Sequence, residues 1–548
     1  MESELPAETA TPQFTDDQLL QFLMQELDFR HCTKTLKVLQ EETECIYNPV
    51  QQFGDMTRLT ALLNLGAMVS REIREASLDR TDQAVSKLRE QLANVGLLPK
   101  AAVEVHSEGD IWDELPDAGT NIRYQEGLDV AALSSPEEQQ LVDLGYYSPI
   151  PPSAIVAGTL NKLVGRLAQS DVDSFEEAQY QTVILRSYHL WCSPATLLDK
   201  LMQRYDVPWP TGVDGLLEPD VFERTIQRPI QLRVVNFISN WVTYYFSDFN
   251  DALLERLSAW AETVVGQDSI PLTNKLRGAI ARRVAKPLKR VLTVAGDHPS
   301  PQLPPGIPAS KLTLADVPAV ELARQLALMV HEKYAAIETT ELHKCAWLES
   351  DARTLAPNVV AMQALFNHIA SVVSTAVVTP ERAIARARAY QYWAAVATEL
   401  RALHSLDGLN AVLAGLSNAA VYRLKQTLLQ VPKRVLDSVK ELQDLTNPNG
   451  SYKNLRAEIK SVGDPVTPYL GMYLSDLAFT EEANTDLDDG LLNLTKGRLV
   501  SNIIGELASH QGFGFALLGV EAVQELIERA PVLTEEELDA ASAEREGR

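Results

Sequence analysis

The sequence of 548 residues is poor in cysteine and contains no cysteine pair with the spacing of a metal site. Its four cysteines are widely separated, at Cys32, Cys45, Cys192 and Cys345. A structural zinc site needs closely spaced ligands, so this pattern gives no support for one. The N-terminal residues lack the basic and apolar segments of a secretory leader, so we expect a cytoplasmic protein with free, buried thiols.

Long apolar runs and an excess of basic charge are also absent. No window approaches 18 uninterrupted apolar residues and the C-terminal residues offer no prenylation cysteine, so we expect neither a membrane span nor a prenyl anchor. The 49 basic and 74 acidic side chains give a formal net charge of −25. Because a polyanionic partner requires a basic face, we expect no nucleic acid partner.

The common signatures of nucleotide hydrolysis, metal-dependent hydrolysis and acyl transfer are missing too. The sequence contains no GxxxxGK[ST] loop, no guanine-reading NKxD, no HExxH and no GxSxG. The histidines are scattered, so we expect no metal site. A large protein without such a constellation is expected to act through a binding surface, not as an enzyme that makes or breaks covalent bonds.

What the sequence does contain is mainly amphipathic helix. Apolar residues recur at three- and four-residue intervals through most of the chain, whereas alternating strand patterns are sparse. We therefore predict an all-α fold with several helical domains. Composition divides the N-terminal part of the chain into a disordered tail (1–15), two helical segments (16–50 and 51–98) and an acidic linker (99–150). The rest of the chain is divided into a helical domain (151–268), a basic and proline-rich linker (269–311), a second helical domain (312–532) and an acidic tail (533–548).

Three stretches of the second helical domain resemble, in order and spacing, the catalytic domain of Ras guanine-nucleotide exchange factors (RasGEF). The first runs from Glu321 to the Ala-Pro-Asn of residues 356–358. The second is LNAVLAGL followed by AVYRLKQT, which ends at Thr427. The third and most specific is PVTPYLGMYLSDLAFTEEAN, residues 465–484, followed by DGLLN. The resemblance implies a helical domain that promotes release of GDP, and so loading of GTP, on a Ras-like small GTPase.

Two further resemblances lie upstream. Residues 157–164, together with RVVNFISNW at residues 233–241, resemble the Ras exchanger motif, which braces the catalytic helices in that family. Residues 19–42 resemble a LisH motif, a short helical dimerisation module, although an ordinary amphipathic hairpin packed on residues 55–93 is the alternative. The LisH resemblance predicts a homodimer held by Leu20, Leu23, Phe29, Leu36 and Leu39.

The family opens its GTPase with a projecting helical hairpin, which presents an apolar residue toward the magnesium site and an acidic one toward the phosphate-binding groups. The corresponding segment here is residues 431–463, with helices expected at 432–446 and 451–462 around a turn at 447–450. The sequence leaves both roles open among five candidates, Leu436, Glu441, Leu442, Asp444 and Leu445.

Other GTPase contacts implied by the resemblance are polar or aromatic side chains, which could instead brace the domain itself. They are Asn358, Tyr422, Arg423, Lys425 and Asn454. The chain is expected to need no cofactor of its own, because GDP, GTP and Mg²⁺ would belong to the partner GTPase. The alternative function is an exchange-inactive dimeric scaffold that binds small GTPases.

Some positions depart from the family pattern and leave the identity of the GTPase open. They are the HSLD of residues 404–407 in place of NNFN, His189 in place of Arg, Ala483 in place of Gly, and Gly497 in place of Lys or Arg.

Residues 275–290 are basic and contain no acid. This segment could be a solvated helix between domains, or it could contact anionic lipid at the inner face of the plasma membrane or an acidic surface of this protein.

Overall fold

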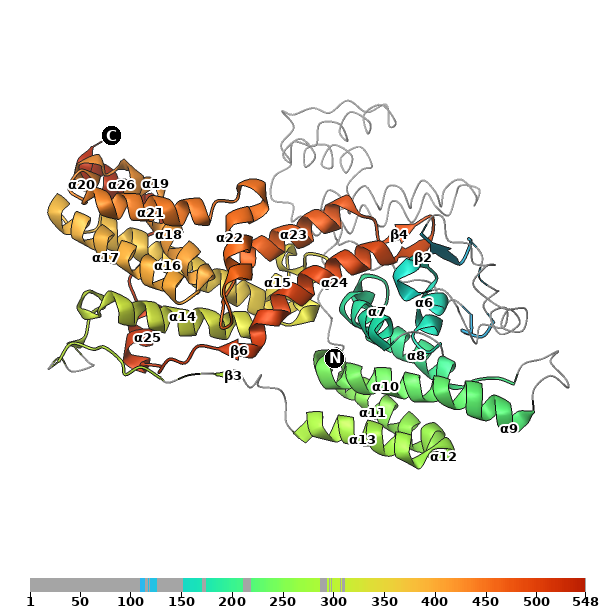
Figure 1. The fold of residues 1–548 in the computed structure, drawn as a ribbon. Coiled ribbons are helices and arrows are strands. Elements are labelled where there is room, and N and C mark those ends of the chain that lie inside the picture. The colour runs from blue at the N-terminus through green and yellow to red at the C-terminus, as the bar shows by residue number, and fades with distance from the viewer. Residues whose placement is uncertain are drawn as a thin grey trace, which may run out of the picture. The chain divides into compact units, whose positions relative to one another are not determined.

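The computed structural model describes residues 109–113, 117, 119–125, 151–169, 174–209, 218–285, 293–294, 296, 298–305, 307 and 311–547. All of them belong to one compact unit, Ala102–Arg548. Helices dominate the described part of the chain and the strands are short, so the all-α prediction is confirmed (Figure 1). The predicted dimerisation residues Leu20, Leu23, Phe29, Leu36 and Leu39 lie outside the described residues.

The first helical domain is organised around a buried carboxylate. Asp248 accepts hydrogen bonds from the hydroxyl of Tyr188 (2.5 Å) and the indole nitrogen of Trp241 (2.6 Å), and its other oxygen lies 3.1 Å from Nε2 of His189. His189 therefore pairs with this carboxylate. The helices of the domain are α6 (Leu160–Arg166), α7 (Ser174–Ser187), α8 (Pro194–Tyr205), α9 (Pro219–Phe222), α10 (Arg228–Tyr244), α11 (Asp251–Trp260), α12 (Gly266–Asp268) and α13 (Ile270–Ala285).

Helix α13 lies within the segment that we expected to be a linker. It packs on α10, and its buried face includes Leu276 and Ala279 (Figure 1). Arg277 forms an ion pair of 2.7 Å with Glu262 of the segment that follows α11. The linker expectation is therefore wrong for α13, and the described part of the basic segment contacts its own helical domain.

A small antiparallel sheet joins the two helical domains. Its strand order is β1-β2-β5-β4, with β1 at Ile122–Tyr124, β2 at Ile155–Gly158, β5 at Leu491–Asn493 and β4 at Leu487–Asp488. In the pairing of β2 with β5, Ala157 lies opposite Asn493. Ile122 is 5% exposed. The linker expected over residues 99–150 is therefore wrong at β1, because a few apolar residues anchor that segment.

The core of the second helical domain is formed by four helices that pack on one another, α14, α16, α17 and α18 (Figure 1). Helix α16 is long and apolar enough to span a membrane by length and composition alone, but it packs on α14, α17 and α18 within this core. The elements of this domain are α14 (Ala319–Ala336), α15 (Ala352–Leu355), α16 (Pro357–Val378), α17 (Ala383–Ala402), α18 (Leu406–Leu416), α19 (Ala419–Arg423), α20 (Lys425–Leu428), α21 (Lys433–Leu445), α22 (Asn449–Ser461), α23 (Leu470–Ala483), α24 (Leu494–Ser509), α25 (Glu521–Glu528) and α26 (Glu535–Glu546), with β3 (Thr293–Val294) parallel to β6 (Phe513–Gly514).

The C-terminal helix α26 corrects the expectation of an acidic tail at residues 533–548. Thr534 accepts a hydrogen bond from the amide of Glu537 (3.2 Å), and the Glu537 carboxylate accepts one from the amide of Thr534 (2.8 Å). This reciprocal pair is a capping box, which stabilises a helix start. Leu538 is 1% exposed, and α26 packs on α16 and α19. The segment is therefore an integral helix of the domain.

Helices α7 and α24 hold the two domains together at a glycine contact. A Cβ atom added at Gly497 of α24 would lie 2.6 Å from the ring of Trp191 and 2.9 Å from Oγ of Ser187. Glycine at position 497, where the family pattern has Lys or Arg, thus allows the indole of Trp191 to pack directly against the α24 backbone. Nearby, Nε2 of His343 lies 2.7 Å from the carbonyl oxygen of Arg186.

Replacing Gly497 by alanine is expected to destabilise the protein by about 1–3 kcal/mol, because Trp191 is 1% exposed and has no room to move. Thermal unfolding of the full chain measures the effect. The matched control is Gly512→Ala, since an added Cβ at exposed Gly512 meets no atom within 4 Å. Equal melting temperatures for the two variants would contradict the close contact.

Candidate functional site

Helices α21 and α22 form the helical hairpin expected from the sequence. They are joined by a turn in which Gly450, Ser451 and Tyr452 have φ angles of 65°, 56° and 58°. Positive φ is easy for glycine and costly for the other two residues, so neighbouring contacts must hold the turn. Nε of Arg456 donates a hydrogen bond to the carbonyl oxygen of Ser451 (2.8 Å), and the side-chain amide of Asn454 donates one to the carbonyl oxygen of Asp444 (3.0 Å). The candidate Asn454 thus braces the hairpin.

The apolar face of α21 is turned inward. Val439, Leu442 and Leu445 are 3%, 3% and 9% exposed, and α21 packs on α17 and α18. Leu442 and Leu445 are therefore core residues, and the hypothesis that either could enter a GTPase is wrong. Val439, Leu442 and Leu445 follow one another at intervals of three residues, which places them on one face of a helix. This spacing is the sequence signal that could have identified the two leucines as core residues.

The opposite face of α21 is exposed and charged. Glu441 and Asp444 lie on it together with Asp437 and Lys440. Leu436 is half-buried at the border of this face. Among the five hairpin candidates, the structure therefore leaves Glu441 and Asp444 as accessible acids and Leu436 as the accessible apolar residue.

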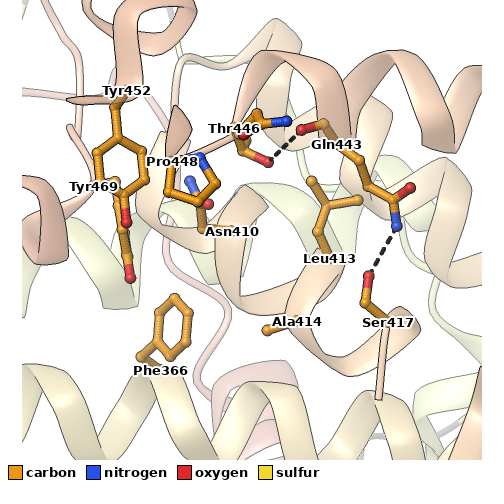
Figure 2. Close-up of a pocket in the computed structure, with 11 residues that line it drawn as sticks. Phe366, Asn410, Leu413, Ala414, Ser417, Gln443, Thr446, Pro448, Tyr452 and Tyr469 are labelled. Atoms are coloured by element: carbon orange, nitrogen blue, oxygen red, sulfur yellow. Dashed lines mark hydrogen bonds between the residues drawn. The ribbon is translucent and has the colours of Figure 1, made fainter. Parts of the chain in front are cut away.

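Polar contacts fix the hairpin to the domain on three sides. Oε1 of Glu458 lies 3.2 Å from Nε of Arg401 on α17. Arg456 pairs with Asp476 of α23 at 2.5 Å. The side-chain amide of Gln443 donates to the hydroxyl of Ser417 (2.8 Å), as Figure 2 shows. The hairpin is thus held in one orientation relative to the core helices.

A groove with a cavity volume of about 470 Å³ is lined by residues of the hairpin and of helices α16 and α18 (Figure 2). The hairpin contributes Gln443, Thr446, Asn447, Pro448 and Tyr452, and α16, α18 and the residue after α18 contribute Phe366, Asn410, Leu413, Ala414 and Ser417. Tyr469 also lines the groove, and its ring centroid lies 5.7 Å from that of Tyr452. Burial, together with Tyr452 and Asp407, raises the pKa of Tyr469 to about 12. The phenol is therefore neutral at physiological pH, and the groove offers apolar and neutral polar contacts.

Tyr422 stands at the surface of α19, just beyond the end of α18. Its side chain is 68% exposed, and the ammonium group of Lys425 lies 3.4 Å from its ring centroid. Such a contact between a cation and an aromatic face holds both side chains near one another. Arg423 forms an ion pair of 3.1 Å with Asp539 of α26. The structure therefore brings together Tyr422, Arg423 and Lys425 on one short segment.

Asn358 has a different role. Its backbone and side-chain amides donate to the carboxylate of Glu341, both at 2.7 Å, and the amide of Val359 donates to the same carboxylate at 3.1 Å. Glu341 is 3% exposed and satisfies the first amides of α16. Of the two roles that the sequence left open for Asn358, the structure favours internal bracing.

No group of three or more potential metal ligands occurs among the described residues. The buried cation Lys496 pairs with Glu481 (2.9 Å) and Asp486 (2.5 Å), so that its charge is neutralised internally. This cluster fixes the chain around the β4–β5 turn, next to the strand that pairs with β2.

The sequence patterns of two known domains match the chain. The RasGEF domain matches residues 321–498, and the RasGEF N-terminal motif matches residues 154–259. The chain thus contains a RasGEF domain and a RasGEF N-terminal motif. Its RasGEF domain contains the hairpin, the groove and Tyr422, and its N-terminal motif contains α7, α10 and the buried Asp248.

Curated relatives of the chain carry the names of Ras exchange or releasing factors. The Ras guanine nucleotide exchange factor J of Dictyostelium discoideum is 28% identical, and the alignment covers 97% of this chain and 72% of the relative. The exchange factor A of the same organism is 27% identical, covering 93% and 82%. The mouse Ras-specific guanine nucleotide-releasing factor 1 is 30% identical, covering 58% of this chain and 26% of the relative.

Proposed function

We propose that this RasGEF protein promotes release of GDP, and so loading of GTP, on a Ras-like small GTPase. The observation that carries the proposal is the hairpin α21–α22, with an exposed acidic face beside a groove, inside a RasGEF domain. The names of its relatives, which are exchange factors and releasing factors for Ras, support the same function.

The proposed mechanism needs no covalent chemistry and no cofactor of the chain's own. An exchange factor binds the nucleotide-free GTPase more tightly than the loaded one, and by linkage it weakens nucleotide binding by the same factor. A 10⁵-fold faster release corresponds to about 7 kcal/mol of preferential binding to the opened state. The nucleotide and its Mg²⁺ belong to the partner.

We propose that the exposed side of the hairpin provides this preferential binding to the opened state of the GTPase. Glu441 and Asp444 would repel phosphate groups, and Leu436 would offer no oxygen to Mg²⁺, which prefers oxygen ligands. Tyr422 and the groove beside α18 would hold a second segment of the GTPase. Asp444 is accessible for this role even though its carbonyl oxygen is engaged by Asn454, because its side chain is exposed.

The test is release of fluorescent GDP from purified Ras-, Rap- and Ral-type GTPases in the presence of the full chain. We expect acceleration of at least about a hundredfold over intrinsic release for at least one of them, the equivalent of about 3 kcal/mol. A stable complex that leaves the nucleotide in place would favour the exchange-inactive scaffold instead. Absence of acceleration for all three GTPases would contradict the proposed function.

A further inference from the structure

The C-terminal helix α26 ends in a carboxylate that reaches back into the RasGEF domain. Glu546 is 4% exposed at its side chain and pairs at 2.8 Å with Arg386 of α17, whose side chain is 2% exposed. The same carboxylate accepts hydrogen bonds from the hydroxyl of Thr427 (2.5 Å), the amide of Thr427 (2.9 Å) and the amide of Gln426 (2.6 Å). Its two oxygens therefore receive four donors.

The carboxylate of Glu546 accepts hydrogen bonds from backbone amides in the first turn of helix α20. The residue before α20 is Leu424, whose apolar side chain provides no cap. The first amides of a helix have no partner within it and need an acceptor. Glu546 supplies a charged acceptor to Gln426 and Thr427, and charge-assisted hydrogen bonds are the stronger kind. A residue of α26 thus acts as the missing cap of α20.

The charge of Glu546 is maintained by its donors. Burial by itself raises the pKa of this carboxyl, but the hydrogen bonds from Thr427, Arg386 and the two backbone amides more than offset burial and leave the pKa lowered. The group is therefore ionised at neutral pH. Arg386 also donates to the carbonyl oxygens of Pro380 and Glu381, at 3.0 and 2.7 Å, so its position is set independently of α26.

Helix α26 contacts the segment on both sides of Tyr422. On one side, the hydroxyl of Ser542 donates to the carbonyl oxygen of Ala420 (2.7 Å). On the other side, Asp539 pairs with Arg423 at 3.1 Å. The exposed ring of Tyr422 thus stands between a residue whose backbone carbonyl contacts α26 and a residue whose side chain contacts α26.

We propose that Glu546 is a positioning residue for nucleotide exchange: by capping α20 it holds residues 420–427, and with them Tyr422, in the orientation that meets the GTPase. This inference rests on the proposed function of the chain. Because α21 packs on α17 and α18, the hairpin keeps its own support when the cap is lost. Loss of Glu546 should therefore weaken GTPase binding more than the release step that the hairpin performs.

The experiment compares the full chain with Glu546→Gln, which keeps the size of the side chain and removes its charge. The matched control is Glu544→Gln on the same helix, since the Glu544 side chain is 72% exposed and lies outside the network. With a GTPase that the unmodified chain activates, we expect KM to rise about tenfold in Glu546→Gln, the equivalent of about 1.4 kcal/mol of binding. We expect kcat to stay within about twofold, because the hairpin keeps its support on α17 and α18. A lost fraction of folded protein would have the opposite signature, since it would lower kcat and leave KM unchanged.

Hydrogen exchange provides a readout that does not depend on activity. The amides of Gln426 and Thr427 should lose protection in Glu546→Gln and keep it in Glu544→Gln. If Glu546→Gln does not fold, Arg386→Met/Glu546→Leu replaces the buried pair by apolar side chains and removes the cap without an unpaired charge. That double variant is expected to show the same rise in KM.

Two results would overturn the proposal. A folded variant with unchanged KM would show that the cap is irrelevant to binding, even if the two amides lose protection. Unchanged protection would show that Glu546 does not hold α20. If the unmodified chain activates no GTPase, the proposed function fails instead, and hydrogen exchange still decides whether Glu546 caps α20.

Discussion

Replacing Glu441 and Asp444 together by alanine is expected to slow GDP release by about a hundredfold, the equivalent of about 3 kcal/mol of transition-state stabilisation. Both carboxylates are exposed on α21, and neither forms a salt bridge with another described residue. Two like unit charges 4 Å apart repel by about 4 kcal/mol at an effective dielectric constant of about 20. One well-placed carboxylate beside a phosphate group is therefore sufficient for an effect of this size.

Stability should not change in this variant, since alanine is the best helix former and no packed atom is removed. The control is Glu521→Ala/Glu528→Ala, which takes two exposed carboxylates from α25 and should release GDP like the unmodified chain. The measurement is the single-turnover release rate at saturating chain, with melting temperatures recorded for both variants. Release that stays within about twofold of the unmodified rate would show that the hairpin acids do not drive exchange.

The hairpin itself was predictable because its signals are local. Pro448, Asn449 and Gly450 favour a turn, and the observed helices begin and end within two residues of the expected limits. The orientation of α21 was predictable as well, from the spacing of Val439, Leu442 and Leu445. Choosing the five hairpin candidates by residue type alone ignored that spacing, and it placed two core leucines, Leu442 and Leu445, among them.

The C-terminal helix was missed for a different reason. Its sequence is acidic and contains little apolar surface, which is typical of a solvated tail. Thr534 followed three residues later by Glu537 was a local sign of a helix start. The contact that gives the helix its proposed role joins Glu546 to Arg386, far apart in the chain, and no local pattern encodes such a pair.

Asn358 illustrates the same limit. Polar residues at the start of a helix can either bind a partner or satisfy backbone groups, and their type does not distinguish these roles. Only the fold brings Glu341 to the start of α16, where it accepts both amides of Asn358. Packing decides such cases, so sequence reasoning located the hairpin but could not assign the contacts of individual polar residues.

Replacing Asp407 by asparagine is expected to raise stability at pH 8 by up to about 4 kcal/mol and to change it little at pH 4. Asp407 is 2% exposed at the start of α18, and burial raises its pKa to about 7, although a hydrogen bond from the amide of Leu470 (2.9 Å) lowers it in part. In the unfolded chain this carboxyl has a pKa near 4, about three units lower.

The folded state thus binds the proton of Asp407 more tightly than the unfolded state does. Its contribution to stability is fully present below pH 4 and is lost as the pH rises to about 7. Asparagine is neutral throughout this range and still accepts the hydrogen bond from Leu470. The measurement is the free energy of unfolding in denaturant between pH 4 and pH 8, and the control is Asp437→Asn on the exposed face of α21.

Two buried histidines change the free energy of unfolding with pH in the direction opposite to Asp407. The quantity to compare is therefore the difference in the free energy of unfolding between the variant and the unmodified chain. Burial lowers the pKa of His331, and burial with the neighbouring His189 lowers that of His343 to about 3. Their contributions are present above pH 6.5 and are lost as the pH falls. Both histidines remain in the variant, so their effects largely cancel in the difference. A difference that stays constant from pH 4 to pH 8 would show that Asp407 is not the buried acid inferred here.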